Sequence, residues 1–265
     1  MEKFKKPLLL HEQIDYLHLK KNISFDNTNI SFAENCLLKY NYINVITPFK
    51  HYYALKNSDY QLIKDDNENH IYPKETDFLE YIVRYSNERQ VYPTIFQNIS
   101  TFETNFNSIF THFTITFYNI DSFERFNSFI TSLKLKLVFF DKNYKLKEQI
   151  SRTINNFENK LNEFNNLYIL FDRLSLNDLC NLFRVIDQKL KNKIFKALLE
   201  FDKTLKFSDL NTFESKLYII VGIRNCICHN NNLEILVRFY DFKRADIRSS
   251  SDQKAYKRLI EKLCK

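Results

Sequence analysis

Glycine and proline are almost absent from the chain. Gly222 is the only glycine among 265 residues, and the four prolines all lie at or before Pro93. Tight β-hairpins most often turn at Asn-Gly or Asp-Gly, so hairpins of this usual kind are unavailable here. Long helices joined by Asn, Asp and Ser turns are the economical alternative. The scarcity therefore argues against a hairpin-rich β fold and predicts an all-α protein.

A regular cysteine pattern and long apolar runs are missing as well. The five cysteines are odd in number and irregularly spaced, unlike the disulfide framework of a small secreted protein. No apolar stretch approaches the length that crosses a bilayer, and only three consecutive leucines precede His11 and Glu12 near the N-terminus. We therefore expect a cytoplasmic protein in a reducing compartment, with no signal peptide and no membrane segment.

Aromatic residues and positive charge are abundant. The chain has 26 phenylalanines and 16 tyrosines, and its 44% hydrophobic content is enough to fill a core. Thirty-nine Lys and Arg against 32 Asp and Glu give a formal net charge of +7. An excess of this sign favours a polyanionic partner such as a nucleic acid.

Helical periodicity is clear along much of the sequence. Apolar residues step by four and three from Ile95 to Phe113 and again from Ile150 to Phe164. The stretch FTHFTITFYN, at 110–119, has strand propensity, but we let the helical period decide. Capping residues and apolar spacing predict further helices. These cover 8–20, Asn29 or Ser31 to Tyr42, Thr76 or Asp77 to Asn87, a segment after Asp121 or Ser122, a segment after Ser175, 194–205, 213–221 and 252–264.

The organisation into domains is only loosely marked. The polar segment 56–73 is typical of a surface loop, while no internal repeat and no Gly/Ser or Pro linker separates two folding units. We therefore treat 1–265 as one helical protein. It divides loosely at a basic, Asn-bearing turn near 141–145 into an N-terminal half, 1–140, and a C-terminal half, 141–265.

The segment IIVGIRNCICHNNNLEIL, at 219–236, concentrates reactive and polar groups after a core-like run. Asn225 lies four residues before His229, so on a helix both share a face and the amide can orient the imidazole. Arg224 lies five residues before His229, about 140° round an ideal helix. The two converge only if the long arginine reaches across or the helix ends here, and the asparagines after His229 are compatible with such an end.

Metal-independent RNA cleavage is the chemistry that this set favours. A guanidinium is a cationic fork suited to a phosphodiester, and an imidazole can take and return a proton near neutral pH. No Asp or Glu lies between residues 224 and 233, so a metal clamp is not evident and we expect no cofactor. The substrate's 2′-hydroxyl would attack and leave a 2′,3′-cyclic phosphate. One histidine is too few for separate acid and base roles, which argues for a homodimeric site.

The motif RNCICHNN resembles the RNxxxH motif of HEPN ribonucleases. Three blocks resemble the Abi-like (AbiD/AbiF) abortive-infection proteins, relatives of the type VI CRISPR effector nucleases. They are KPLLLHEQIDYLHLKKNISF, LYILFDRLSLNDLCNLFRVID and LYIIVGIRNCICHNNNLEIL, whereas residues 56–140 match poorly. The chain departs from the family where Tyr168 replaces a frequent Trp, Asn177 a frequent Gly, and Asn232 an Arg that often follows the His-Asn run.

The resemblance implies a fold, an activity and partners. The fold is an all-helical HEPN bundle in 141–265 with an N-terminal helical extension in 1–140. Arg224 and His229 are implied to be catalytic, with Asn225 orienting, in a homodimer whose motifs face each other. The implied role is antiviral defence by abortive infection, as a toxin-like endoribonuclease. Some members are thought to be held in check by a small RNA, so RNA is expected as substrate and regulator.

Further RNA contacts are expected from the motif and from the tail VRFYDFKRADIR, at 237–248. Basic side chains could track a phosphate backbone while Phe239 or Tyr240 stacks on bases. A solvated charged face is the alternative for this tail. The RNA-binding set comprises Asn230, Asn232, Arg238, Lys243, Arg244 and Arg248.

Other interpretations of the motif remain open at this point. Cys226, Cys228 and His229 are zinc-ligand types, but no fourth ligand lies nearby in the sequence, so we interpret the cysteines as helix-packing residues. Arg224 and His229 could also be a structural arginine and a core histidine. The alternative function is a non-catalytic module that holds, or is regulated by, a structured RNA. A third is a protein-interaction subunit that uses the helical surface alone.

Overall fold

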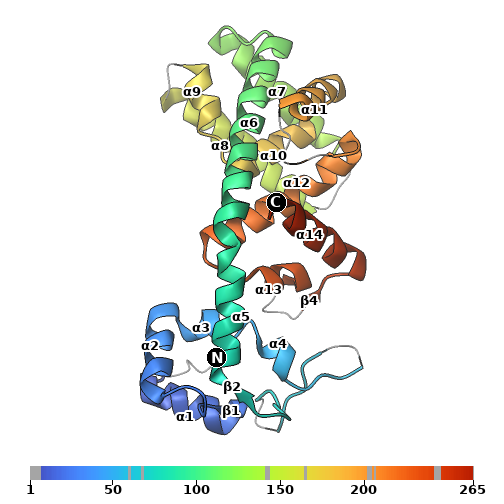
Figure 1. The fold of residues 1–265 in the computed structure, drawn as a ribbon. Coiled ribbons are helices and arrows are strands. Elements are labelled where there is room, and N and C mark those ends of the chain that lie inside the picture. Colours follow the sequence, from blue (N-terminus) through green and yellow to red (C-terminus); the bar gives the residue numbers. More distant parts are fainter. Residues whose placement is uncertain are drawn as a thin grey trace. The chain divides into compact units, whose positions relative to one another are not determined.

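The computed structural model describes residues 7–58, 61–66, 69–140, 144–163, 166–201, 205, 207–241 and 246–264 (Figure 1). Most of the described residues are helical, which confirms the all-α prediction. The chain divides into two compact units, one of Met1–Pro93 with Cys226–Ala255 and one of Thr94–Asn225 with Tyr256–Lys265. We call them unit 1 and unit 2. The division predicted near 141–145 falls inside unit 2, between two of its helices.

Unit 1 contains short helices and two small strand pairs. Its helices are α1 (Leu10–Lys21), α2 (Ile30–Tyr40), α3 (Tyr42–Val45), α4 (Lys50–Tyr53), α5 (Phe78–Gln90) and α13 (Leu233–Arg238). Strands β1 (Ile23–Ser24) and β2 (Thr76–Asp77) pair in parallel, and β3 (Phe239–Asp241) pairs antiparallel with β4 (Asp246–Ile247). The described residues of the predicted loop 56–73 contain no helix and only two isolated bridges.

Capping side chains set the helix starts in unit 1. The Asn29 side-chain Oδ1 accepts from the Phe32 amide and begins α2, and the Asp77 carboxylate accepts from the Leu79 amide and begins α5. Both starts confirm predictions. The predicted end of the second helix at Tyr42 is wrong, because Asn41 has a positive φ of 70° and its side chain caps α3 instead.

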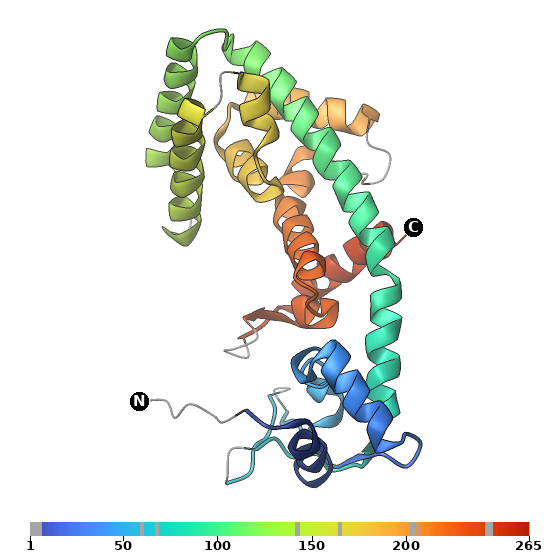
Figure 2. The same cartoon turned by 90° about the vertical axis from the view of Figure 1, so that its left-hand side faces the viewer.

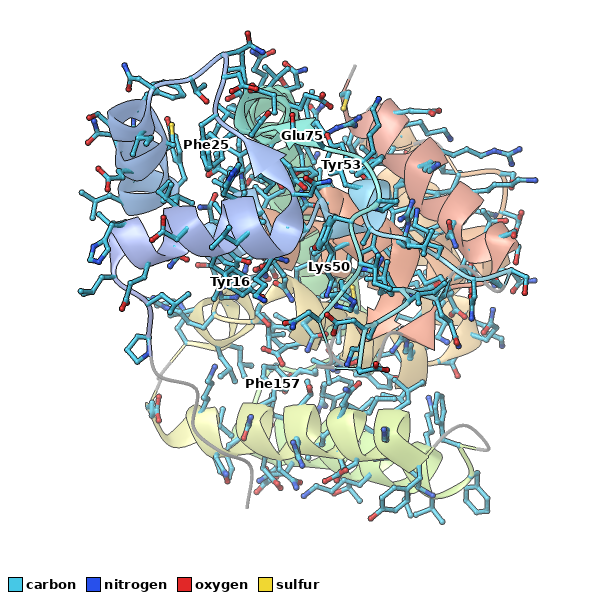
Figure 3. All side chains as sticks on the ribbon, turned by 90° about the horizontal axis from the view of Figure 1, so that it is seen from below. Tyr16, Phe25, Lys50, Tyr53, Glu75 and Phe157 are labelled. Carbon is cyan, nitrogen blue, oxygen red and sulfur yellow. The ribbon has the colours of Figure 1, made fainter. Side chains whose placement is uncertain are left out.

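The interior of unit 1 joins α1, α2 and α5. Buried apolar side chains from these helices and from β1 form one cluster. Its fully enclosed members are Leu17, Ile23, Ala33, Val45, Ile46, Phe78 and Tyr81. Viewed from below, Figure 3 shows Phe25 beside this interior, where its ring lies 5.5 Å from that of Phe78. The cluster holds the three helices together.

Unit 2 is built mainly from longer helices. They are α6 (Tyr92–Tyr118), α7 (Phe123–Val138), α8 (Tyr144–Lys160), the 3₁₀ turn η1 (Leu161–Glu163), α9 (Leu167–Asp172), α10 (Leu176–Val185), α11 (Gln188–Phe201), α12 (Leu210–Cys228) and α14 (Ser250–Leu263). The unit boundaries fall inside α6, α12 and α14. Figure 2 shows α7 and α8 side by side, and α10 packs against both.

Phenylalanines fill the interior of unit 2. Phe106 and Phe213 are fully buried, and their ring centroids lie 5.8 Å apart in an edge-to-face arrangement. Phe102, Phe110 and Phe183 extend the same cluster. Burial of this face explains why α6 continues through the β-prone stretch at 110–119 to Tyr118, as the period predicted. No helix in the described part of the chain is long and apolar enough to cross a membrane.

Candidate functional site

Helix α12 carries the first half of the motif and ends at its second half. Arg224 and Asn225 lie in its last turns, and His229 is the first residue after Cys228. The Asn230 amide donates to the Ile227 carbonyl at 3.0 Å, and the Asn231 amide donates to the Cys226 carbonyl at 2.8 Å. This pair of bonds is the Schellman motif.

The Schellman end requires a left-handed residue, and Asn230 supplies it with a φ of 55°. Asparagine is the commonest substitute for glycine at this position, because its short side chain tolerates a positive φ. His229 therefore occupies the cap position of the helix, and the helix end expected after it is confirmed.

Side chains from α5 and the start of α6 hold the backbone after His229. Arg89 donates to the Asn230 carbonyl at 2.7 Å, and the Tyr92 hydroxyl donates to the Asn231 carbonyl at 2.5 Å. The Arg89 guanidinium lies over the rings of Tyr85 and Tyr92, at 4.7 and 4.5 Å from their centroids. These contacts are all within unit 1 and fix the position of the turn that follows the histidine.

Glu88 fixes the next residues of the same turn. Its carboxylate accepts from the Asn232 side-chain amide and from the Leu233 backbone amide at the start of α13. Burial raises the pKa of Glu88, while the hydrogen bond from Leu233 acts in the opposite direction. The Asn232 side-chain Oδ1 accepts from the Ile235 amide as the helix cap, at 3.0 Å. Asn232 is buried, so its side chain serves the local fold, and its predicted contact with RNA stays a prediction.

Arg224 lies beside an acidic residue of α6. Its Nε is 3.7 Å from the Glu103 carboxylate, which is an ion pair but too long for a hydrogen bond. The other Glu103 oxygen accepts from the Leu176 backbone amide at 3.0 Å and is thereby held in place. The pair uses one edge of the guanidinium, while about a third of the Arg224 side chain remains exposed. The two terminal nitrogens are the edge that suits a phosphate.

Glu103 also lines a cavity of about 650 Å³ in unit 2. The cavity lies between α6 and the 168–174 segment, and Asn107 crosses it by donating to the Asp172 carbonyl at 3.4 Å. Tyr168 stands on its wall with 57% of its surface exposed. Its size is typical of small-molecule sites. The remaining lining residues are Thr104, Ser108, Thr111, Ile169 and Leu174.

The two other predicted catalytic side chains are accessible. His229 and Asn225 are exposed, and His229 makes no hydrogen bond or ion pair to any residue that the structure describes. Asn230 is exposed as well. In unit 2 the Glu103 carboxylate holds Arg224, and in unit 1 a hydrogen-bonded turn follows the unengaged imidazole of His229. Such groups can bind a phosphodiester and move a proton.

The residues of the predicted RNA-binding tail differ in their exposure to solvent. Arg238 is partly exposed and pairs with Glu234 at 3.5 Å. Arg248 is buried and donates through Nε to the Leu236 carbonyl at 2.9 Å. Phe239 is buried against the His51 ring, so it presents no face to a base. Lys243 and Arg244 lie outside the described residues, and RNA contact by this tail stays a prediction.

The cysteines of the motif have different surroundings. Burial raises the pKa of Cys226 to about 12, with the Glu88 charge as a further cause, whereas Cys228 is exposed. A thiol of high pKa is a poor metal ligand, since thiolate is the binding form. Among the described residues, no three of His, Cys, Asp and Glu gather where a metal ion could be held.

Sequence reasoning missed the residues that support the motif, namely Glu88, Arg89, Tyr92 and Glu103. One of them left a signal. Glu103 is the only Asp, Glu, Lys or Arg in the 27 residues of α6. A single charged residue on a long helix of otherwise uncharged residues is the sequence signal for it. Glu88 and Arg89 lie in an ordinary charged helix end, and the sequence carries no comparable signal for them.

The family model described as Abi-like protein matches residues 35–233. The chain belongs to the Abi-like protein family. The match includes the middle block with Tyr168 and the whole of the Arg224 to His229 motif, and it confirms the family that the three blocks indicate. Comparisons with curated proteins and with solved structures found no match. In this Abi-like protein the site is therefore interpreted from its own residues.

Proposed function

We propose that this Abi-like protein is a metal-independent endoribonuclease of the HEPN type that acts in abortive-infection defence against phage. Membership of the Abi-like family supports the defence role. The observation that carries the nuclease role is the exposed, unengaged His229 at the rigid end of α12, following Arg224 on the same helix. An imidazole left without a partner in a fixed turn is available for proton transfer.

The proposed reaction is a transfer within the substrate. The 2′-hydroxyl oxygen of RNA forms a bond to the adjacent phosphorus, and the bond to the 5′-oxygen breaks. One proton leaves the 2′-hydroxyl and one reaches the departing 5′-oxygen, so neither water nor a metal ion is consumed. His229 moves a proton, and Arg224 stabilises charge on the phosphate through its terminal nitrogens. Glu103 acts as a positioning residue for that arginine.

The balance of two protons makes a homodimer part of the proposal. One imidazole cannot serve as base and acid at opposite ends of the scissile group at once, but two copies related by a two-fold axis supply two. A dimer of one wild-type and one His229→Ala subunit should then lose as much activity as the doubly substituted dimer. Retention of half the activity would mean that each subunit cleaves alone.

Cleavage of labelled single-stranded RNA in EDTA tests the reaction. We expect wild-type protein to produce 2′,3′-cyclic phosphate ends, with about 10²-fold or greater loss in Arg224→Ala and in His229→Ala. Exposed residues of the same types, His11 and Arg258, provide matched controls, and their alanine variants should cleave normally. Equal activity in His229→Ala and wild type would contradict the proposal.

A second candidate function is a non-catalytic protein that holds a structured RNA. The Arg224 and Glu103 pair favours it, because an arginine engaged by a carboxylate offers less charge to a scissile phosphate. In that case RNA binding would fall steeply with salt, and neither wild type nor variants would cleave. RNA that copurifies with both wild type and His229→Ala, and stays intact in both, would select this function.

A further inference from the structure

Basic side chains gather in unit 1 around the end of α1 and the loop that follows α4. The Lys21 ammonium donates to the Tyr72 hydroxyl at 2.8 Å and lies 4.8 Å from the centre of the Tyr72 ring. The Lys50 ammonium is 3.5 Å from Nε2 of His70. Figure 3 labels Lys50 and also Tyr16, whose ring lies 5.9 Å from the Lys21 nitrogen. We call Lys21, Lys50, Lys64, His70 and Tyr72 the basic cluster.

The positive charges of the basic cluster repel one another. Burial lowers the pKa of Lys21 to about 8, and the Lys50 charge contributes to the change. Burial also lowers the pKa of Lys50, assisted by Lys64. The pKa of His70 falls to about 4 through burial and through the charges of Lys50, Lys21 and Lys64. The ammonium groups of Lys21, Lys50 and Lys64 thus come from three segments and all act on His70.

Lys21 is the most deeply buried cation of the basic cluster. Its residue is 8% exposed, yet within the described residues it has no carboxylate partner, only the phenol oxygen and aromatic faces. Lysines are almost never buried without a paired charge. Nδ1 of His70 is buried and also lacks a hydrogen-bond partner among these residues. An anion with several acceptor oxygens could accept from the Lys21 ammonium and from Nδ1 of His70 together.

We propose that the basic cluster of Lys21, Lys50, Lys64, His70 and Tyr72 is a binding site for a phosphate group. A phosphate offers oxygens to several ammonium and hydroxyl donors at once, and lysine is a common phosphate ligand. The phosphate is carried either by the RNA backbone or by a free nucleotide. The site goes beyond the proposed cleavage, because it shares no residue with Arg224, His229 or their supports.

Titration of the full-length protein with inorganic pyrophosphate and with ATP tests the site at constant ionic strength. We expect either probe to raise the melting temperature of wild type. Lys21→Met and Lys50→Met should weaken binding at least tenfold. Lys20→Met is the matched control, since Lys20 is exposed on the same helix, and its binding should equal that of wild type. No effect of either probe on wild type, or an equal loss in Lys20→Met, would overturn the proposal.

A 2′-O-methyl RNA oligonucleotide separates the two sources of phosphate, because it cannot be cleaved by its own 2′-oxygen. Tenfold weaker binding of this RNA to Lys21→Met assigns the site to the RNA backbone. Weakening confined to ATP and pyrophosphate assigns it to a free nucleotide. Arg224→Ala should retain phosphate binding. Cleavage with no phosphate effect would overturn this inference alone, and a phosphate effect with no cleavage would overturn the nuclease proposal alone.

Discussion

Two lysines of the molecule are equally buried but differently compensated. Lys21 in unit 1 and Lys191 in unit 2 are each 8% exposed. The Lys191 ammonium lies 2.7 Å from the Glu214 carboxylate and donates to the Arg184 carbonyl at 2.8 Å. Lys21 has a phenol oxygen, two aromatic faces and a neighbouring lysine. Burial alone therefore does not distinguish Lys191 from Lys21. The groups that contact each ammonium do.

The interiors of the two units also differ in which side chains they bury. Phenylalanine rings fill the interior of unit 2, and two of its buried polar side chains pair with each other, where the Asn181 amide donates to the Thr153 hydroxyl at 3.1 Å. Unit 1 buries tyrosines, His51 and Lys21 beside its apolar cluster. Burial and nearby cations lower the pKa of His51 to about 3. The contrast predicts that apolar packing supplies most of the unfolding free energy of unit 2. In unit 1, the buried Lys21 and His51 lower the unfolding free energy.

The largest effect should follow from removing the central ring of unit 2. Phe213 is fully buried, and its ring contacts those of Phe102, Phe106, Phe183 and Phe195. Phe213→Ala should lower the free energy of unfolding by about 4 kcal/mol, because it deletes a buried ring and leaves a cavity. Urea unfolding measures the change.

The matched control for this substitution is Phe139→Ala. Phe139 is 84% exposed, so its ring buries little surface and its loss should leave the unfolding free energy nearly unchanged. Equal losses in the two variants would contradict a stability based on packing in unit 2.

Removing the carboxylate that compensates Lys191 should have the next largest effect. Glu214→Ala recreates in unit 2 the situation of Lys21, a buried ammonium that has no acidic partner among the residues the structure describes. Breaking a buried pair leaves an uncompensated charge, so we expect a loss of about 3 kcal/mol in unfolding free energy.

An exposed pair provides the control for this prediction. Lys134 and Glu158 form an ion pair at 2.6 Å, with 44% and 38% of their side chains exposed. Glu158→Ala should cost under about 1 kcal/mol, since exposed pairs contribute little. If Glu214→Ala cost no more than Glu158→Ala, burial would not distinguish the two pairs.

The longer helices of both units followed from local patterns, but the short elements and the supports of the motif did not. Apolar spacing predicted α6 and α8, and the side chains of Asn29, Asp77 and Ser175 marked helix starts, because both signals lie within one helix. The tiny parallel pair of β1 and β2 was missed, since it joins segments far apart in the sequence and has two residues a strand.

The same limit applies to the site. Arg224 and His229 are close in sequence and were predicted from their chemistry and family resemblance. Glu103 reaches Arg224 from a distant helix, and Glu88 and Arg89 reach the turn from another. The compensation of Lys191 and the lack of it at Lys21 are likewise tertiary facts. Such pairings depend on packing, which periodicity does not report.

Lowering the pH should reduce the stability of unit 1, because His51 is buried there and His70 is partly buried. The pKa of His51 is about 3 and that of His70 about 4 in the folded protein, against 6.5 for an ordinary histidine. As pH falls below 6.5 the unfolded chain takes up these protons first, so folded-state stability is lost between pH 6.5 and about 3. Between pH 7 and pH 5 the two shifts correspond to about 4 kcal/mol, and because solvent partly screens the two rings we expect a loss of about 2 kcal/mol.

Hydrogen exchange at pH 7 and pH 5 measures this loss in each unit separately. Protection should fall more in α4 and α5, which belong to unit 1, than in α10 and α11 of unit 2. His51→Gln should flatten the pH dependence of unit 1. An equal fall in both units would mean that the buried histidines do not set the difference.

The smallest effect, and the one of opposite sign, concerns Lys21 itself. Lys21→Met keeps a long side chain but removes a buried charge that has no acidic partner in the described part of the chain, so we expect an increase of about 1 kcal/mol in unfolding free energy at pH 7. The folded pKa of Lys21 is about 8, below its ordinary value of 10.5. Wild-type stability should therefore rise with pH between about 8 and 10.5, where only the unfolded chain still holds the proton, and the gain from Lys21→Met should shrink over that interval. Urea unfolding at pH 7 and pH 10 measures both. A loss of stability at pH 7 would show that the phenol and aromatic partners already compensate Lys21, and the two lysines would then be equivalent.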